Sequence, residues 1–522
     1  MSRFFRLLSI ALLIVLTRGL CDQAYSSSSL RGDLKPGAYA VGYTTVFEYD
    51  LARSPVADGS GKIPNGVGGR QMQINIWYPA APSQRGAMMK FEDYVHLLAQ
   101  ELDFTAIDKA RSLKAQRQFV ESTVELGGNA NDLESKLSSL LKLDTAARRN
   151  APAARGRFPL IIFPDSPVKN SILCEYLATY GFVAVAVSIK GTHEAELDVG
   201  LTGIESIVTD LQFVIGRVRE LPMVDGDKLG LIGLGFSASG CLALAMRSRE
   251  VDAFVSLEGG ILTRFEDGLL KQNAYFDVSA VRVPVLAIHA PHPDVNPDFL
   301  NQYRYTTRYA VGFSGMSEFY FLNYGMFERF VPGIIGKPPG DTKAGFEWGS
   351  RYTLNFLQAH LKNDNQSLAF LRNLPSGNSV PQGLLSANVM AGLRPPPLTY
   401  ELKAMIRREG IQSVVRLYHE LKKNDPQPFS HQKYLDLTNW LAWRRDPEWK
   451  MRKELALLRV DSYPNSSRAH FSLANIALQS NDKELARKHF SETLRLVAND
   501  SDPTLNESLR KRMEEIAKQN LS

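Results

Sequence analysis

The chain has 522 residues, of which 44% are hydrophobic, 22% charged and 10% aromatic. This length predicts roughly three domains, and the composition excludes the disordered, collagen-like and polytopic membrane classes. Lys and Arg number 61 against 55 Asp and Glu, a net charge of +6. Between Glu401 and Val460 we count 13 basic and 8 acidic residues. This surplus is too dilute to indicate a nucleic-acid partner, and we expect none.

Residues 1–21 have the pattern of an export signal. Arg3 and Arg6 form a positively charged start, Leu7–Leu16 an apolar run, and Cys21 ends a short cleavage triplet. The apolar run is too short to span a bilayer comfortably. We therefore expect an exported protein, periplasmic or secreted, and favour this over lipid anchoring at Cys21.

The three cysteines, Cys21, Cys174 and Cys241, are too few for a disulfide framework, and no Cys/His spacing of the zinc type occurs. The sequence therefore suggests no metal centre, and we expect no cofactor. Cys174 and Cys241 lie in apolar helical contexts, so we expect buried free thiols there.

Alternating strand and helix patterns predict an α/β domain over residues 38–374. Its core strands are continuous apolar runs, as in a mostly parallel sheet covered by helices on both faces. Residues 91–148 have a helical period and no strand signal, which predicts a helical insertion. This insertion is a candidate lid. The expected strands are Tyr39–Tyr49, Gln71–Tyr78, Pro159–Phe163, Phe182–Val187, Leu229–Leu234, Ala253–Leu257, Val283–His289 and Tyr305–Phe313.

Residues 375–397 are rich in Gly, Ser and Pro and are predicted to be a linker. Residues 398–522 have helical patterns throughout, so we expect an all-α domain. Ala474, Ala486 and Phe490 have the spacing of packing residues in a tetratricopeptide repeat, with a turn at Asn481. The domain is thus predicted to be tetratricopeptide-like, with an unrelated helical tail as the alternative. A protein partner is possible for these helices.

The strongest local motif is an apolar strand, a turn of small residues and an apolar helix, over Leu231–Leu244. This is the context of a nucleophile elbow, and we place its centre at Ser237. Such a turn strains the nucleophile's backbone and needs small neighbours two positions away, here Gly235 and Ser239. The alternative is a buried strand–turn–helix with no exposed hydroxyl.

Several motifs together resemble the α/β-hydrolase superfamily over residues 38–362, and within it the bacterial relatives of platelet-activating-factor acetylhydrolase and dienelactone hydrolase. The motifs are Tyr39-Ala-Val-Gly42, Ile76-Trp-Tyr-Pro79, Phe158-Pro-Leu-Ile-Ile162, Glu175-Tyr-Leu-Ala-Thr-Tyr-Gly-Phe182, Val224-Asp-Gly-Asp-Lys-Leu-Gly230 and Gly235-Phe-Ser-Ala-Ser-Gly240. This resemblance is specific for the fold and unspecific for the substrate, because one fold serves many chemistries.

The resemblance implies that Ser237 is the nucleophile and that the Ala238 N–H stabilises the oxyanion. The second donor is expected from the loop after the first βαβ strand, as the N–H of Asp165 or Ser166. Two positions compete for the triad acid. We favour Glu258, which follows a strand, over Asp294, which follows the next one.

The catalytic histidine is difficult to assign from the sequence. The position that holds it in relatives is occupied here by Glu318, which at its ordinary pKa is a poor proton shuttle. His292 is our candidate base, although a surface histidine fits that loop as well. His360 lies on an amphipathic helix and is assigned a structural role.

Two functions follow from these observations. The first is an exported serine hydrolase that cleaves carboxylic esters, a short-acyl lipid ester or a lactone, through an acyl-enzyme at Ser237. The alternative is a catalytically impaired hydrolase scaffold that binds a ligand or a protein, because Glu318 stands in the histidine position.

Overall fold

The computed structural model describes residues 29–64, 66–82, 85–443, 449–500 and 505–521. The predicted export signal therefore lies outside the described residues. The chain forms two compact units that do not follow its order: the first comprises Met1–Asp267, Val283–Leu300 and Arg308–Met390, and the second Gly268–Arg282, Asn301–Thr307 and Ala391–Ser522.

The described part of the first unit contains one sheet, in the order β11-β10-β9-β8-β7-β5-β6-β2-β1-β4-β3. From β6 to β10 all neighbouring strands are parallel, whereas β2 joins β6 and β1 in antiparallel pairs. The strands are β1 (Ala40–Asp50), β2 (Arg70–Ala80), β3 (Ala87–Lys90), β4 (Asp144–Arg149), β5 (Phe158–Phe163), β6 (Val183–Val187), β7 (Val224–Leu234), β8 (Ala253–Leu257), β9 (Val285–His289), β10 (Arg308–Phe313) and β11 (Leu385–Met390).

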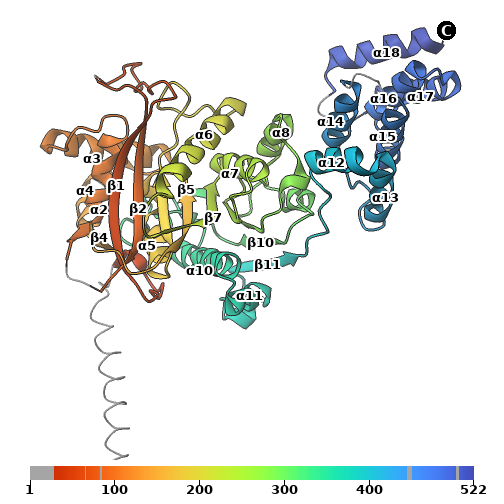
Figure 1. Cartoon of the computed structure of the whole chain (residues 1–522). Coiled ribbons are helices and arrows are strands. Elements are labelled where there is room, and N and C mark those ends of the chain that lie inside the picture. The colour runs from red at the N-terminus through yellow and green to blue at the C-terminus, as the bar shows by residue number, and fades with distance from the viewer. Residues whose placement is uncertain (1–28, 65, 83–84, 444–448, 501–504, 522) are drawn as a thin grey trace, which may run out of the picture. The chain divides into compact units, whose positions relative to one another are not determined.

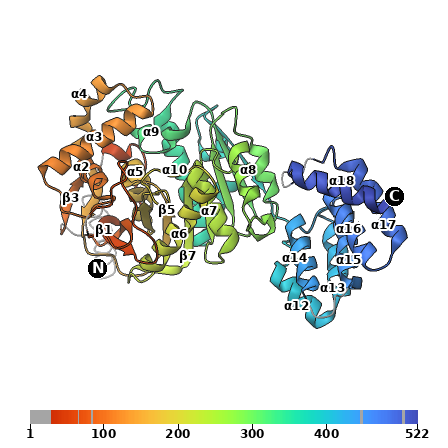
Figure 2. The same ribbon diagram turned by 90° about the horizontal axis from the view of Figure 1, so that it is seen from above.

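Helices cover both faces of this sheet (Figures 1 and 2). In Figure 1, α10 lies below the sheet while α6 and α7 lie above it. Strands β5, β6 and β8 are buried along their whole length, as a sheet covered on both faces requires. The helices after β5 are α5 (Pro167–Thr179), α6 (Leu201–Val218), α7 (Phe236–Arg247), α8 (Arg264–Gln272), α9 (Tyr324–Phe327), α10 (Thr342–Leu361) and α11 (Asn365–Arg372).

This topology is that of an α/β-hydrolase, so the predicted fold class is confirmed. Cys174 and Cys241 are buried free thiols, also as expected. None of the helices within the described residues is long and apolar enough to cross a membrane.

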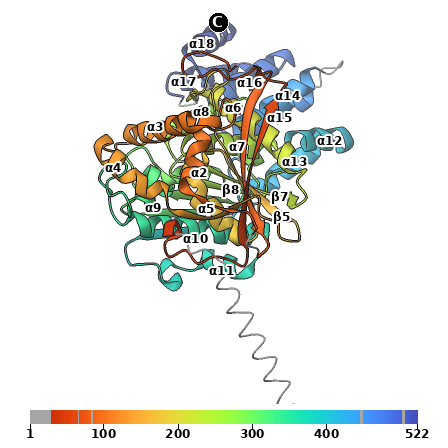
Figure 3. The same cartoon turned by 90° about the vertical axis from the view of Figure 1, so that its left-hand side faces the viewer.

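The insertion contains α2 (Phe91–His96), α3 (Lys109–Glu125) and α4 (Ala130–Leu141), seen in orange in Figure 3. Its stripe of leucines, Leu133, Leu137, Leu140 and Leu141, is buried. The expectation of no strand signal up to residue 148 is wrong, because β4 begins at Asp144 and extends the sheet beside β1. Polar side chains such as Arg148 and Arg149 conceal this strand, which lies between β1 and β3, from an apolar pattern search.

The segment 375–397 is not a plain linker. It contains β11, which pairs antiparallel with β10 and so belongs to the sheet. Exposed and partly buried residues alternate along its first positions, as on an edge strand with one face toward solvent. The Gly- and Pro-rich residues on either side of β11 explain why the sequence pattern did not predict this strand.

The second unit is helical over most of the described residues that follow β11. Its helices are α12 (Thr399–Glu409), α13 (Ile411–Lys422), α14 (His431–Ala442), α15 (Trp449–Ser462), α16 (Ser467–Gln479), α17 (Lys483–Leu496) and α18 (Glu507–Leu521). From α14 to α18 each helix packs against the next, whereas α13 packs against α12 and α15. Ala474 of α16 packs in one cluster with Ala486 and Phe490 of α17. The tetratricopeptide-like assignment of these helices stays a prediction.

Candidate active site

The turn between β7 and α7 has the form of a nucleophile elbow, and its strained residue is Gly235. Gly235 has φ +49° and ψ −129°, and α7 begins at the next residue. This backbone conformation is costly for any residue with a side chain. The expectation that Ser237 takes the strained position is therefore wrong: the elbow motif runs from Gly233 through Gly235 to Ser237, and a glycine stands where the nucleophile belongs.

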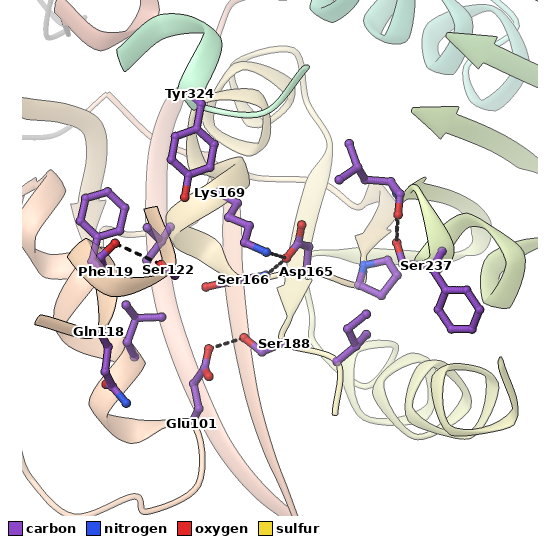
Figure 4. Close-up of a pocket in the computed structure, with 16 residues that line it drawn as sticks. Glu101, Gln118, Phe119, Ser122, Asp165, Ser166, Lys169, Ser188, Ser237 and Tyr324 are labelled. Carbon is purple, nitrogen blue, oxygen red and sulfur yellow. Dashed lines mark hydrogen bonds and ion pairs between the residues drawn. The ribbon is translucent and has the colours of Figure 1, made fainter. Parts of the chain in front are cut away.

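Ser237 lies two residues further on, inside α7, and is only 4% exposed. Its Oγ donates a hydrogen bond to Leu234 O at 2.9 Å and accepts one from Leu234 N at 3.0 Å. Figure 4 shows the hydroxyl directed toward the backbone at the end of β7. No histidine is among the residues that line the cavity beside Ser237. Both hydrogen bonds of this hydroxyl are with the backbone of Leu234, so none of the described residues contacts it as a side-chain base.

All three predicted oxyanion donors already have acceptors. Asp165 N donates to Phe163 O at 2.8 Å, and Ala238 N donates to Gly235 O at 3.0 Å. Ser166 N donates to the Asp165 carboxylate at 2.7 Å. An oxyanion would have to displace these acceptors, because a single N–H group offers one hydrogen.

Glu318 stands directly beside the elbow. A β-carbon added to Gly235 would lie 2.9 Å from Glu318 Oε1. Burial raises the pKa of this carboxyl group above its ordinary value, and the positive charge of Lys169 opposes the shift. The structure thus brings the residue in the histidine position to the elbow, but the group present is a carboxyl.

Glu258 also reaches this place. It follows β8 directly, has φ +47° and is 9% exposed. Burial, followed by the charge of Glu318, raises the pKa of Glu258 to about 7. Gly235, Glu318 and Glu258 together line a cavity of about 840 Å³. Glu318 and Glu258 are the residues that the resemblance implies for the histidine and acid positions, and Gly235 takes the strained elbow position that was expected for Ser237.

His292 and Asp294 lie at the same cavity but are exposed. Their side chains are 58% and 77% accessible, and His292 Nδ1 is 3.7 Å from an Asp294 carboxylate oxygen. Ser237 lines a different cavity, so the structure does not bring His292 and Ser237 to one site. His360 contacts Tyr309 Oη at 3.1 Å, and burial lowers its pKa to about 4. This agrees with a structural role.

The cavity beside Ser237 measures about 400 Å³ and is shown in Figure 4. The insertion supplies one wall, including Glu101 and Phe119. The charged side chains that line this cavity have partners within the protein. Glu101 accepts a hydrogen bond from Ser188 at 2.5 Å, and Lys169 lies 3.4 Å from Asp165. Phe236 lines this cavity and the larger one, so it stands between the two chambers.

The described residues contain no group of three His, Cys, Asp or Glu side chains arranged to hold a metal ion.

Sequence reasoning missed the role of Gly235, because the eight residues from Gly233 to Gly240 fit an elbow pattern in two registers. The register with Gly235 at the centre follows only once the end of β7 is fixed at Leu234.

Comparison with known proteins gives one family match and a structural likeness to solved structures. The family model "BAAT / Acyl-CoA thioester hydrolase C terminal" matches residues 214–313, which include the elbow. A ferulic acid esterase from Streptomyces cinnamoneus is structurally similar, with 17% identity and a TM-score of 0.44 over 63% of this chain and 93% of the esterase chain. The search of curated proteins gives no match. The family match includes β7, α7, β8, β9 and β10, the central part of the α/β-hydrolase sheet.

Proposed function

We propose that this protein binds a small ligand at its hydrolase site and does not form an acyl-enzyme. One observation carries the proposal: the elbow residue is Gly235, which has no side chain to attack a carbonyl carbon. Covalent catalysis needs a nucleophile with a base within hydrogen-bond reach. At this elbow the neighbouring group is the Glu318 carboxyl, with Oε1 close to the place where a nucleophile's β-carbon would be.

The experiment rebuilds the missing groups. In a double variant, Gly235→Ser with Glu318→His, a hydroxyl stands at the elbow and an imidazole replaces the carboxyl. Glu258, which lines the same cavity, is the proposed acid. We expect a fluorophosphonate probe to label this variant, and nitrophenyl acetate to be hydrolysed faster than by the wild type. Each single variant is the matched control and should stay unlabelled, because it lacks either the nucleophile or the base.

Labelling of the wild-type chain that disappears in Ser237→Ala would contradict the proposal. It would favour the second candidate, a serine hydrolase that cleaves carboxylic esters, short-acyl lipid esters or lactones, through Ser237. That candidate is supported by the family match over residues 214–313 and by the position of Ser237 at a cavity. Equal ester hydrolysis by wild type and Ser237→Ala would remove it.

Export is part of the proposal, on the strength of the pattern in residues 1–21. Expression with a C-terminal tag, followed by fractionation and sequencing of the mature N-terminus, tests it. A full-length chain retained in the cytoplasm would contradict it. The ligand of the hydrolase site is proposed to be a small molecule or lipid ester, and the helical unit a tetratricopeptide-like module for a protein partner.

A further inference from the structure

We propose that α12 and α14 carry a docking surface for an acidic peptide segment of a partner protein. The surface, here called the basic–aromatic patch, consists of Tyr400, Lys403 and Arg407 on α12 with Trp440 and Trp443 at the end of α14. The three α12 residues are spaced i, i+3 and i+7, which places them on one face of the helix. The two tryptophans are three residues apart, so they also lie on one side.

Stacking holds the two halves of the patch together. The Arg407 guanidinium carbon is 5.2 Å from the centre of the Trp440 ring, and Lys403 Nζ is 6.0 Å from it. These are cation–π distances. Neither cation forms a salt bridge with a carboxylate among the described residues, whereas the adjacent Arg408 is paired with Glu409 at 2.5 Å. The patch therefore presents two positive charges beside an aromatic ring, and no described carboxylate forms a salt bridge with either of them.

The patch also exposes an unusual amount of aromatic surface. Trp443 is 89% exposed and Tyr400 is 54% exposed. Large aromatic side chains are seldom left in water in this way unless they serve contact with another molecule. Trp, Tyr and Arg are also the residues that dominate the binding energy of protein interfaces. A complementary partner combines carboxylates with an apolar side chain.

The surrounding charges favour a short acidic segment over a long polyanion. α12 carries Glu401 in its first turn and Glu409 at its end, so acidic groups flank the patch on both sides. A nucleic-acid backbone, with its regular charge spacing, would meet these carboxylates as well as the cations. A short peptide can place its carboxylates beside the two cations and away from these glutamates.

The test uses the full chain and a fluorescein-labelled peptide in which glutamates flank a phenylalanine. We expect polarisation to report binding that weakens with salt, and the Arg407→Glu and Trp443→Ala variants each to lower the affinity about tenfold or more. Arg408→Glu is the matched control, since it reverses a neighbouring charge that is already paired, and it should leave the affinity almost unchanged. Circular dichroism verifies that each variant is folded.

Intrinsic fluorescence gives a second measurement at the patch itself. Acrylamide should quench the tryptophan fluorescence of the wild type more than that of Trp443→Phe. The bound peptide should remove most of that difference, because it covers Trp443. Absence of peptide binding would overturn the proposal. So would equal weakening by Arg408→Glu, which indicates diffuse charge attraction, or tighter binding of a single-stranded oligonucleotide or of phosphatidylserine vesicles than of the peptide.

Discussion

Glu258 is buried beside a second carboxyl group, so the free energy of unfolding should depend on its titration. Its pKa of about 7 lies above the ordinary value of 4.5 that it regains on unfolding. The folded state thus favours the protonated form: the stabilising contribution is complete below about pH 4.5 and is lost as the pH rises through about 7.

We therefore expect the wild type to unfold at higher urea concentration at pH 5 than at pH 8. Glu258→Gln should remove about 1–3 kcal/mol of that difference, because the amide does not ionise. The exposed Glu121→Gln is the control and should leave it intact. An unchanged pH dependence in Glu258→Gln would show that Glu258 does not titrate in this range.

Ser237 is predicted to matter for stability and not for chemistry. Its hydroxyl makes two hydrogen bonds with Leu234 at the end of β7, so Ser237→Ala should lower the free energy of unfolding by about 1 kcal/mol. In the background of the Gly235→Ser, Glu318→His double variant, Ser237→Ala should leave fluorophosphonate labelling in place. Loss of labelling there would mean that the probe reacts with Ser237.

At the scale of elements, the elbow depends on the close approach of α6 and α7. A β-carbon added to Gly240 would lie 2.4 Å from Ile207 of α6. Gly240→Ala should therefore push the helices apart and cost about 1–3 kcal/mol in urea unfolding. Gly216 is the matched control within α6, because nothing lies within 4 Å of an added β-carbon there. Gly216→Ala should be neutral or stabilising by up to about 1 kcal/mol; similar losses in both variants would refute the packing argument.

The elements that the sequence predicts well are those whose burial is complete. β5 and β6 are apolar from end to end, and such runs have few other interpretations. β11 was not predicted because an edge strand can remain polar on its exposed side. β4, which lies between β1 and β3, was not predicted because its sequence is largely polar. The sequence drew attention to Glu258 and Glu318 because both follow recognisable strands. The choice between Gly235 and Ser237 depends instead on where β7 ends, and hydrophobic periodicity locates the end of a strand poorly.

At the scale of the whole molecule, the helical unit includes two loops of the hydrolase sheet. Lys433, whose side chain is fully buried, donates to Ser279 Oγ at 2.5 Å and lies 3.6 Å from Asp277. Asp425 accepts hydrogen bonds from Tyr305 at 2.5 Å and from Arg304 at 3.0 Å. Residues far apart in sequence thus satisfy one another's buried polar groups.

A fragment of residues 391–522 should therefore unfold at lower urea concentration than the same helices in the full chain. It lacks the two loops that pack over Lys433 and Asp425, so the hydrogen bonds and the packing that these loops contribute are lost. Equal unfolding midpoints for the fragment and the full chain would contradict this expectation.

The same loops leave the sheet after β8 and β9, the strands that precede Glu258 and His292. The second unit is consequently built from three segments of the chain, and the polypeptide between β11 and α12 is not its sole covalent connection to the first unit. A protease that nicks the chain at residues 391–397 should leave both halves co-eluting in gel filtration until urea separates them. By the same logic, replacing the helical part by that of another protein would also remove the hydrogen-bond partners that it supplies to Ser279, Tyr305 and Arg304 in these two loops.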